Sequence, residues 1–254
     1  HGLWNWNQYR KHNGMPEEIR QHLDTVHANG IGYQPTLQVM DSMQSLFIPD
    51  HLDDPILKKV VPAELLEWYR TSAAHQFKRE LAQEGFDKLP DDRIATLMNI
   101  PISRSERSVR YLSEVGHDLL LASDHPATPG HANLPGLSSY QEMVHMAALG
   151  IPLRKLLESA TINNARMFGL EDRYGSVEPG KTANLLFLHS NYVPAIPRPR
   201  AFLPPLKTHR LPRRFTFFSK FPTPRIPQGY GPFWNHFFSP QTAKRRDREP
   251  RRTN

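Results

Sequence analysis

The chain has 254 residues, of which 38% are hydrophobic, and a formal net charge of +7 at pH 7. The absence of cysteine excludes disulfide bonds and thiolate metal sites, and no apolar run approaches the roughly 20 residues of a membrane helix. The charge is uneven, because residues 190–254 hold 14 Lys and Arg but 2 Asp and Glu, with half of the 24 prolines. We therefore expect the two parts of the chain to fold differently.

The first part of the chain alternates helical patterns with short apolar segments. Residues 16–29 predict a helix, with a proline and two glutamates in its first turn, and residues 31–37 predict a short strand. Residues 47–58 are acidic and flanked by prolines, which indicates a long connection of the kind that covers sites in α/β enzymes. Residues 62–84 predict the clearest helix, which ends before Gly85.

A second series of elements follows the same order. Residues 105–115 predict a helix that Gly116 ends, and residues 118–123 predict a buried strand. Ser139 and Glu142 have the spacing of a capping box for a helix that ends at Leu149. Three further elements are expected: a helix from Ile151 to Glu158, a helix that Thr161 caps and Gly169 ends, and two strands around a Pro-Gly turn at 175–188.

This alternation predicts an α/β fold. Strands and helices that follow each other in this way are typical of the closing part of a parallel α/β barrel. Three strands cannot close a barrel, because open edges and an unfilled interior would be left.

Catalytic groups in such barrels sit at the carboxyl ends of strands, which selects His1, Pro35–Thr36 and Asp124. An aspartate at such a position can bind a metal or accept a proton from water. It can equally be an ordinary cap or turn residue, and a terminal histidine can be without a role. His125 and His131 flank the loop after Asp124 and are the next candidates. The other histidines of the first part show no paired spacing and are interpreted as surface or helix residues: His12, His22, His27, His51, His75, His117 and His145.

Three stretches resemble the metal-dependent amidohydrolase superfamily, and its imidazolonepropionase-like and prolidase-like branch most closely. "LLLASDHPATP" is similar to the family's eighth strand, and "ESATINNARMFGLEDRYGSVEPGKTANLLFL" is similar to its closing helix and sandwich hairpin. "HGLWNW", followed by a helix and "QPTL", is similar to strands six and seven. The resemblance covers about residues 1–189.

The resemblance implies a TIM-like (β/α)8 metallo-hydrolase barrel in residues 1–174 and part of a small β-sandwich in 175–189. It implies that His1 and Asp124 bind one or two zinc ions and that Asp124 takes a proton from the metal-bound water. His125 and His131 would contact the substrate, in a pocket shaped by residues 38–61 and 125–137. The expected activity is hydrolysis of carbon–nitrogen bonds in amide-like small molecules or dipeptides.

The chain also departs from the family pattern. Asn184 and His125 replace residues that are usually Asp and Ser or Thr, and no His-x-His occurs anywhere. The family's remaining metal ligands would all precede residue 1, so the chain is expected to be an inactive C-terminal fragment of an amidohydrolase. Neither the substrate nor the compartment follows from the sequence, although many relatives are cytoplasmic. An oligomer is compatible with it.

Residues 190–254 carry no helical or strand period and are expected to form a disordered tail, which a reading-frame change after Asn191 would explain. The alternative is a non-catalytic remnant whose basic tail binds nucleic acid or anionic surfaces. Basic and aromatic side chains alternate there, at Arg213, Arg214, Phe215, Phe217, Phe218, Phe237, Phe238, Lys244, Arg245 and Arg246. A solvated tail without a role accounts for the same residues, and nucleic acid is the less favoured partner.

Overall fold

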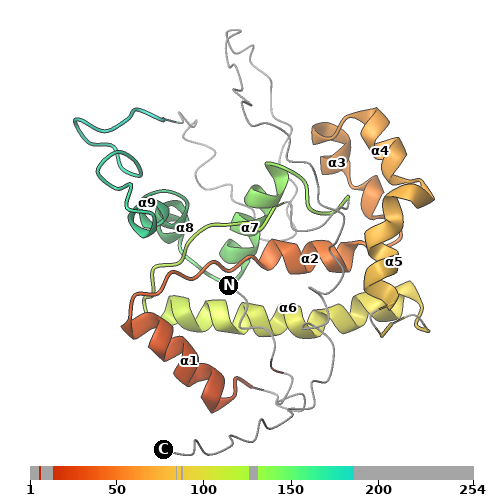
Figure 1. Cartoon of the computed structure of the whole chain (residues 1–254), viewed down its shortest axis with the longest axis horizontal. Helices are drawn as coiled ribbons and strands as arrows, with labels where there is room; N and C mark the ends of the chain where they lie inside the picture. The colour runs from red at the N-terminus through yellow and green to blue at the C-terminus, as the bar shows by residue number, and fades with distance from the viewer. Residues whose placement is uncertain (1–5, 7–13, 84, 87, 126–130, 186–254) are drawn as a thin grey trace, which may run out of the picture. The chain divides into compact units, whose positions relative to one another are not determined.

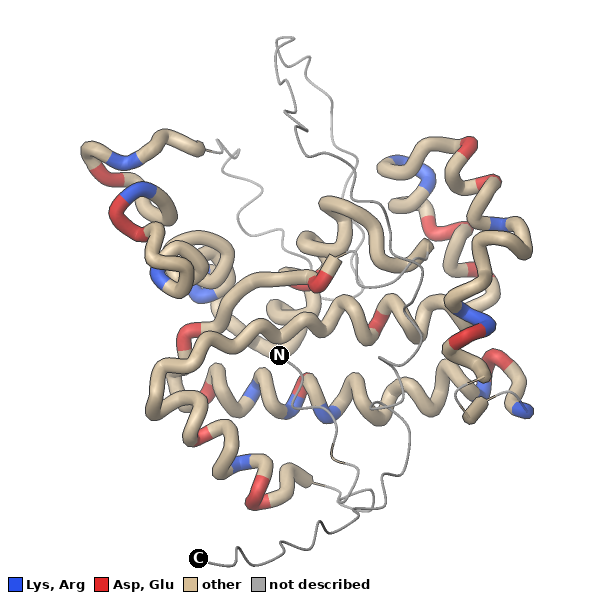
Figure 2. Tube along the Cα trace, viewed as in Figure 1, with Lys and Arg blue, Asp and Glu red and all other residues tan. Residues whose placement is uncertain are grey.

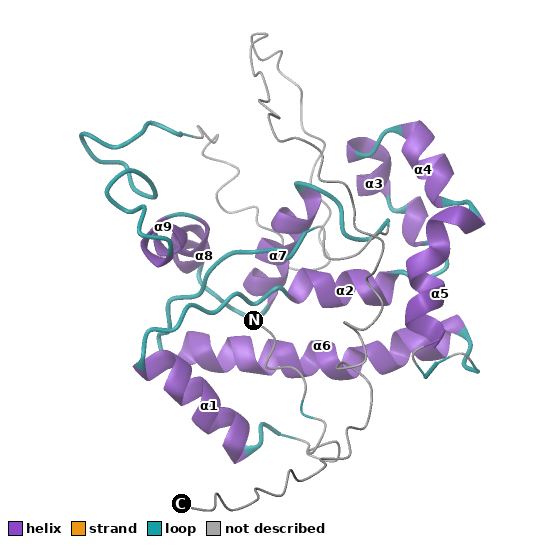
Figure 3. Cartoon of the chain, viewed as in Figure 1, coloured by secondary structure: helices purple, strands orange, loops and turns teal. Residues whose placement is uncertain are grey.

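The computed structural model describes residues 6, 14–83, 85–86, 88–125 and 131–185, and these residues are mainly helical (Figures 1 and 3). The helices are α1 (Glu17–Ala28), α2 (Leu37–Ser45), η2 (His51–Asp53), α3 (Pro55–Val60), α4 (Ala63–Tyr69), η3 (Ser72–His75), α5 (Gln76–Gln83), α6 (Asp91–Glu114), α7 (Leu137–Ala148), α8 (Leu153–Ala160) and α9 (Ile162–Met167). No helix within these ranges is long and apolar enough to cross a membrane. The predicted tail at 190–254 and His1 lie outside the described residues.

The main core lies where α2 packs between α6 and α7 and α1 packs on α6 (Figure 1). Its members are the buried residues Trp6, Ile19, Leu23, Tyr33, Leu37, Val109, Leu112, Leu119, Met146, Leu149, Ile151 and Leu156. A smaller cluster joins α3 and α4 to the segment that precedes α7, through Leu52, Leu57, Val61, Leu66 and Leu134. The two predicted strand segments thus contribute Tyr33 and Leu119 to the main core.

The expected strands at 31–37 and 118–123 are not formed in the described part of the chain. The two segments meet in one parallel bridge between Tyr33 and Leu119, and the Leu120 N–H donates to the Tyr33 carbonyl at 3.0 Å. The relative direction of the two segments therefore agrees with a parallel sheet, but the pairing is one residue long.

The other edge of the 118–123 segment is covered by side chains and backbone of α8 and α9. The Leu121 N–H donates to the Ser159 carbonyl at 3.0 Å. The side-chain amides of Asn163 and Asn164 donate to the carbonyls of Leu119 and Leu121 at 3.1 and 3.0 Å. These groups occupy the backbone sites that another strand would need, so the open edge expected from the sequence is closed without a sheet.

The sandwich hairpin expected at 175–188 is also not formed between residues 175 and 185, and residues 186–188 lie outside the described ranges. The Lys181 ammonium donates to Ser176 Oγ at 2.6 Å, and the Lys181 N–H donates to the Glu178 carbonyl at 3.3 Å. These contacts stabilise a local turn within residues 176–181. No ladder of cross-strand hydrogen bonds develops within this stretch.

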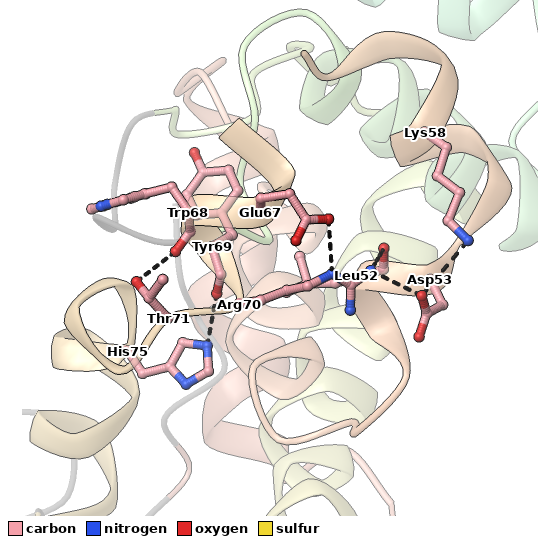
Figure 4. Close-up of polar contacts among 9 residues, drawn as sticks. All are labelled: Leu52, Asp53, Lys58, Glu67, Trp68, Tyr69, Arg70, Thr71 and His75. Atoms are coloured by element: carbon pink, nitrogen blue, oxygen red, sulfur yellow. Dashed lines mark hydrogen bonds and ion pairs between the residues drawn. The ribbon is translucent and has the colours of Figure 1, made fainter. Parts of the chain in front are cut away.

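The helix expected at 62–84 is interrupted after Tyr69 (Figure 4). Thr71 has extended backbone angles, and its hydroxyl donates to the Trp68 carbonyl at 2.7 Å. The Tyr69 carbonyl accepts from His75 Nε2 at 2.9 Å, so both carbonyls have partners that replace the helical ones. The segment therefore divides into α4, η3 and α5.

Helix α2 and the first half of α6 were not expected from the sequence. Residues 38–61 were predicted to be a loop, but they contain α2, η2 and α3. Helix α6 begins at Asp91 rather than at residue 105 and includes Pro101. Tertiary burial outweighs local pattern here, because Ile94 and Met98 are both buried on α6.

Charges on these helices are of both signs and are interspersed (Figure 2). One local network joins η2, α3 and α4, where Asp53 accepts from Arg70 at 2.9 Å and pairs with Lys58 at 3.6 Å (Figure 4). The hydrogen bond from Arg70 lowers the pKa of Asp53. The ion pair between Asp53 and Arg70 is exposed, so it contributes little to stability and mainly orients α4 relative to η2.

Candidate functional site

Asp124 follows the 118–123 segment and has left-handed backbone angles, with φ at 51°. Its carboxylate is exposed, while its carbonyl accepts from the Asn133 side-chain amide at 3.4 Å. The preceding residue, Ser123, is buried and pairs its hydroxyl with that of Ser139 on α7 at 3.2 Å. The backbone around Asp124 is thus held from two sides, and its carboxylate is left for solvent or a ligand.

Thr36 occupies the matching position after the neighbouring segment. Its φ is 49°, and Thr36 and Asp124 are the non-glycine residues with positive φ in the described part of the chain. A β-branched residue rarely adopts this conformation, and such strain gathers at functional sites. Since the Tyr33 and Leu119 segments are parallel, both strained residues lie at the same, carboxyl end.

Glu142 on α7 holds the Thr36 end in place, and sequence reasoning missed this role. The predicted capping box is wrong, because Gly136 precedes α7 and no side-chain cap forms. The Glu142 carboxylate instead accepts from the Gln38 N–H at 2.7 Å, at the start of α2. It is fully buried, and burial raises its pKa to about 7 against the opposing effect of the backbone N–H groups of residues 36–38.

A second polar contact joins α2 to α7 next to Glu142. His145 Nε2 donates to the Gln38 side-chain carbonyl at 3.0 Å and lies 3.8 Å from the Asp41 carboxylate. Helix α7 therefore contacts both strained ends, Ser123–Asp124 through Ser139 and Thr36–Gln38 through Glu142 and His145. The partners in the contacts between α2 and α7 are about 100 residues apart in the sequence, so these contacts could be identified only in the three-dimensional structure.

The two histidines after Asp124 take different positions. The Nδ1 of His125 donates to the Asn133 carbonyl at 3.0 Å, next to the backbone of Asp124. His131 is buried and faces other rings, so the structure does not bring it to the Asp124 carboxylate. Substrate contact by either residue stays a prediction.

His51 and His75 were interpreted as unpaired surface or helix residues, but both contact His131. The ring centroids are 5.8 Å apart for His51–His131 and 5.6 Å apart for His75–His131. The Tyr69 ring lies 5.8 Å from His131 on a further side. Their spacing in the sequence carries no motif, so the cluster could be found only in three dimensions.

The expected zinc site was tested against the donors that the structure describes. No group of three His, Asp or Glu side chains within the described ranges can hold a metal ion. His1, the other predicted ligand, lies outside those ranges. The described donors therefore do not fit zinc on their own.

Cavities also lie elsewhere on the described residues. One of about 640 Å³ is bounded by α8, α9 and residues 171–181, and it is lined by charged side chains that include Arg154, Glu158 and Lys181. Another, of about 370 Å³, adjoins His27, His117 and Asp118 at the amino end of the 118–123 segment. Neither is formed by the predicted pocket segments at 38–61 and 125–137, of which 126–130 are not described.

The Amidohydrolase family matches residues 83–211, half of the chain, and this chain belongs to that family. The match includes the Asp124 end, α7, α8 and α9. It confirms the predicted superfamily and the assignment to hydrolases that act on carbon–nitrogen bonds. Its members are generally metal-dependent and built on a TIM-like barrel, although the sheet is not formed within the described residues.

A curated relative is 5-methylthioadenosine/S-adenosylhomocysteine deaminase of Teredinibacter turnerae, which is 29% identical over 97 residues. The alignment covers 37% of this chain and 22% of the relative, so the match spans about a fifth of that protein's length. The relative does not place the chain in the imidazolonepropionase-like and prolidase-like branch. No solved structure matches.

Proposed function

We propose that Asp124 is the general base of a hydrolase that cleaves a carbon–nitrogen bond in a small molecule. The observation that carries this proposal is the exposed Asp124 carboxylate on a strained backbone, at the carboxyl end of a segment that pairs in parallel with its neighbour. Strain of this kind is maintained only where the surroundings hold it, and here Ser123, Ser139 and Asn133 do so. The family match supports the reaction class.

The chemistry assigned to Asp124 is transfer of one proton. Its carboxylate takes a proton from a water molecule as the water oxygen bonds to the carbon of the C–N group. The same proton then goes to the departing nitrogen as the C–N bond breaks, which leaves the carboxylate ready for another cycle. A carboxylate open to solvent on one side and fixed through its backbone on the other suits this role.

Metal chemistry is left out of this proposal, because the described donors do not fit a metal ion. The family is generally metal-dependent, and His1 with Asp124 stays a predicted pair of zinc ligands. Ligands outside the described ranges would be needed to complete such a site. We propose no step that passes through it.

The similarity to the Teredinibacter turnerae deaminase favours deamination over amide cleavage as the reaction. Its name describes the removal of an amino group from adenosine derivatives. We therefore propose that the hydrolysed bond joins an amino group to a carbon of a nitrogen-containing ring. Ammonia is then one product. The cyclic amides and dipeptides of the imidazolonepropionase-like and prolidase-like branch form the second substrate class, supported by the "LLLASDHPATP" stretch.

The test is a substrate panel with the protein expressed from its whole reading frame. Release of ammonia from 5-methylthioadenosine and S-adenosylhomocysteine is measured beside hydrolysis of cyclic amides and dipeptides. We expect ammonia release from these two adenosine derivatives, without turnover of the cyclic amides and dipeptides, and a loss of at least about 100-fold in kcat for Asp124→Asn. Turnover that Asp124→Asn retains in full would rule Asp124 out as the base.

A further inference from the structure

Three imidazoles from three separate segments meet around His131. His51 comes from η2, His75 from η3 and His131 from the segment that leads from Asp124 to α7. The His131 ring centroid lies 5.8 Å from that of His51, 5.6 Å from that of His75 and 5.8 Å from that of Tyr69. We call these four side chains the imidazole cluster.

The imidazole cluster is arranged for neutral rings. His131 is 4% exposed, and neither its Nδ1 nor the Nε2 of His51 has a hydrogen-bond partner within the described residues. The third imidazole, His75, uses its Nε2 to donate to the Tyr69 carbonyl at 2.9 Å. A positive charge on His131 would therefore be buried beside two other imidazoles, with no acceptor for its Nδ1–H among the described residues.

The charged groups around the cluster act in both directions. Asp41 on α2 and Asp54 after η2 favour a protonated His51, but burial has the larger effect and lowers the pKa of His51. His131 faces no carboxylate among the groups that affect its titration. Burial, with smaller contributions from His51, His75 and Lys78 on α5, lowers the pKa of His131 to about 4.

The cluster connects helices η2 to α5 with the segment that begins at Asp124. Beside His131, Leu134 packs into the smaller apolar cluster with Leu57 and Leu66. Between them, Asn133 is buried and bonds to the backbone of Asp124 and to His125. Residues 131–134 therefore join the imidazole cluster to the backbone of the candidate site.

We propose that protonation of His131 and His51 undocks residues 131–136 from helices η2 to α5, so that the Asp124 end is held at neutral pH and released in acid. At neutral pH His131 and His51 are uncharged, and the three rings pack around His131 beside Tyr69. In acid, His131 and His51 take up protons more readily when they are separated and in water. The apolar contact of Leu134 with Leu57 and Leu66 remains, but it no longer has the support of the packed imidazoles.

The direction of the effect follows from linkage. A histidine whose docked pKa lies below its free value takes up protons on undocking, so docking is fully favoured above pH 6.5 and weakens as the pH falls toward 4. Titration of His131 alone changes the docked-to-undocked ratio by roughly 30-fold between about pH 7.5 and about pH 5. Among the described residues, the three histidines of the cluster do not form a group that could hold a metal ion.

Hydrogen exchange with mass spectrometry tests this on the full chain, without turnover or metal. Protection of peptides that cover 131–137 is compared at about pH 7.5 and about pH 5, after correction for the intrinsic exchange rates. We expect protection to fall by roughly 30-fold in this segment, while α6 stays protected. Equal protection at both pH values would overturn the proposal.

Variants separate titration of the cluster from a general effect of acid. His131→Phe keeps an aromatic ring in the packing and removes the proton site, so it should lose most of the pH dependence. His51→Gln removes one repelling ring and should reduce the dependence partly, which serves as a second measurement if His131→Phe does not fold. His22→Gln changes an exposed histidine on α1 and should behave as the native chain. A full native response in His131→Phe, or in His51→Gln if that variant replaces it, would contradict the proposal.

Discussion

The buried carboxylate of Glu142 is the clearest case in which one side chain organises distant segments. From the sequence, Ser139 and Glu142 predicted a local capping box on α7. In the structure, Glu142 reaches the first turn of α2 and Ser139 reaches Ser123, so both residues make tertiary contacts. The favourable end of the α2 dipole and the N–H of Gln38 partly offset the cost of burying the carboxylate.

Replacing Glu142 by Gln tests this at the residue scale. Because the folded pKa of about 7 lies above the ordinary value of 4.5, the native chain is stabilised below pH 4.5 and loses this contribution as the pH rises through 7. Glu142→Gln should remove that loss and be more stable than the native chain at pH 8, by at most roughly 3 kcal/mol. Urea unfolding at several pH values measures it.

The matched control is Glu114→Gln, which changes an exposed glutamate on α6. Its stability should follow the native pH curve. Protonation of His131 in the imidazole cluster lowers stability as the pH falls, which is opposite in direction to the effect of Glu142 and covers a similar pH range. The stability of the native chain is therefore expected to change little with pH. A Glu142→Gln curve parallel to the native one would show that the carboxylate is ionised throughout this range.

At the scale of elements, α9 takes the place of a neighbouring strand. Its Asn163 and Asn164 side chains satisfy the carbonyls of Leu119 and Leu121, and Ser159 at the end of α8 accepts from Leu121. Thr161 was expected to cap α9, but its hydroxyl donates to the Leu157 carbonyl at 2.6 Å. The α8–α9 corner is thus fixed by its asparagines and by α8, without a threonine cap.

Asn163→Ala should destabilise the fold by about 1–3 kcal/mol, because it leaves the buried Leu119 carbonyl without its donor. Urea unfolding measures the change. Asn99→Ala is the control, since Asn99 is exposed and accepts from Gln44 at the surface of α6. Equal stability losses in the two variants would show that Asn163 does not act as an edge cap.

The sequence predicted helices better than strands for a physical reason. A helix bonds to itself, so α1 lies within the expected range 16–29, and Gly116, Gly150 and Gly169 follow α6, α7 and α9 with positive φ. A strand needs a partner, and the 118–123 segment finds side chains of α8 and α9 instead. The break after Tyr69 also escaped prediction, because it depends on Thr71 and His75 meeting particular carbonyls.

The candidate site could be predicted only in part. Asp124 was selected from its place after an apolar run, and the structure adds the strain at Asp124 and Thr36. Glu142, His51 and His75 were missed as contributors because their partners are remote in the sequence.

For the molecule as a whole, family membership is carried by residues 83–211, and this range contains Asp124 together with α7, whose Ser139 contacts Ser123 beside it. The similar deaminase shares 97 aligned residues with the chain. We therefore propose that one carboxylate, that of Asp124, performs the chemistry and that its neighbours hold it in place. Asp124 should then affect turnover without affecting the fold.

The most direct test is kcat/KM of Asp124→Asn beside Asp118→Asn, in the protein expressed from its whole reading frame. Asp118 starts the same segment at its other end and pairs with Lys155 at 3.5 Å on the surface. We predict that Asp124→Asn loses at least about 100-fold while keeping the native unfolding midpoint, and that Asp118→Asn stays within about 3-fold of the native value. Equal activity of the two variants would contradict the assignment of Asp124 as the base.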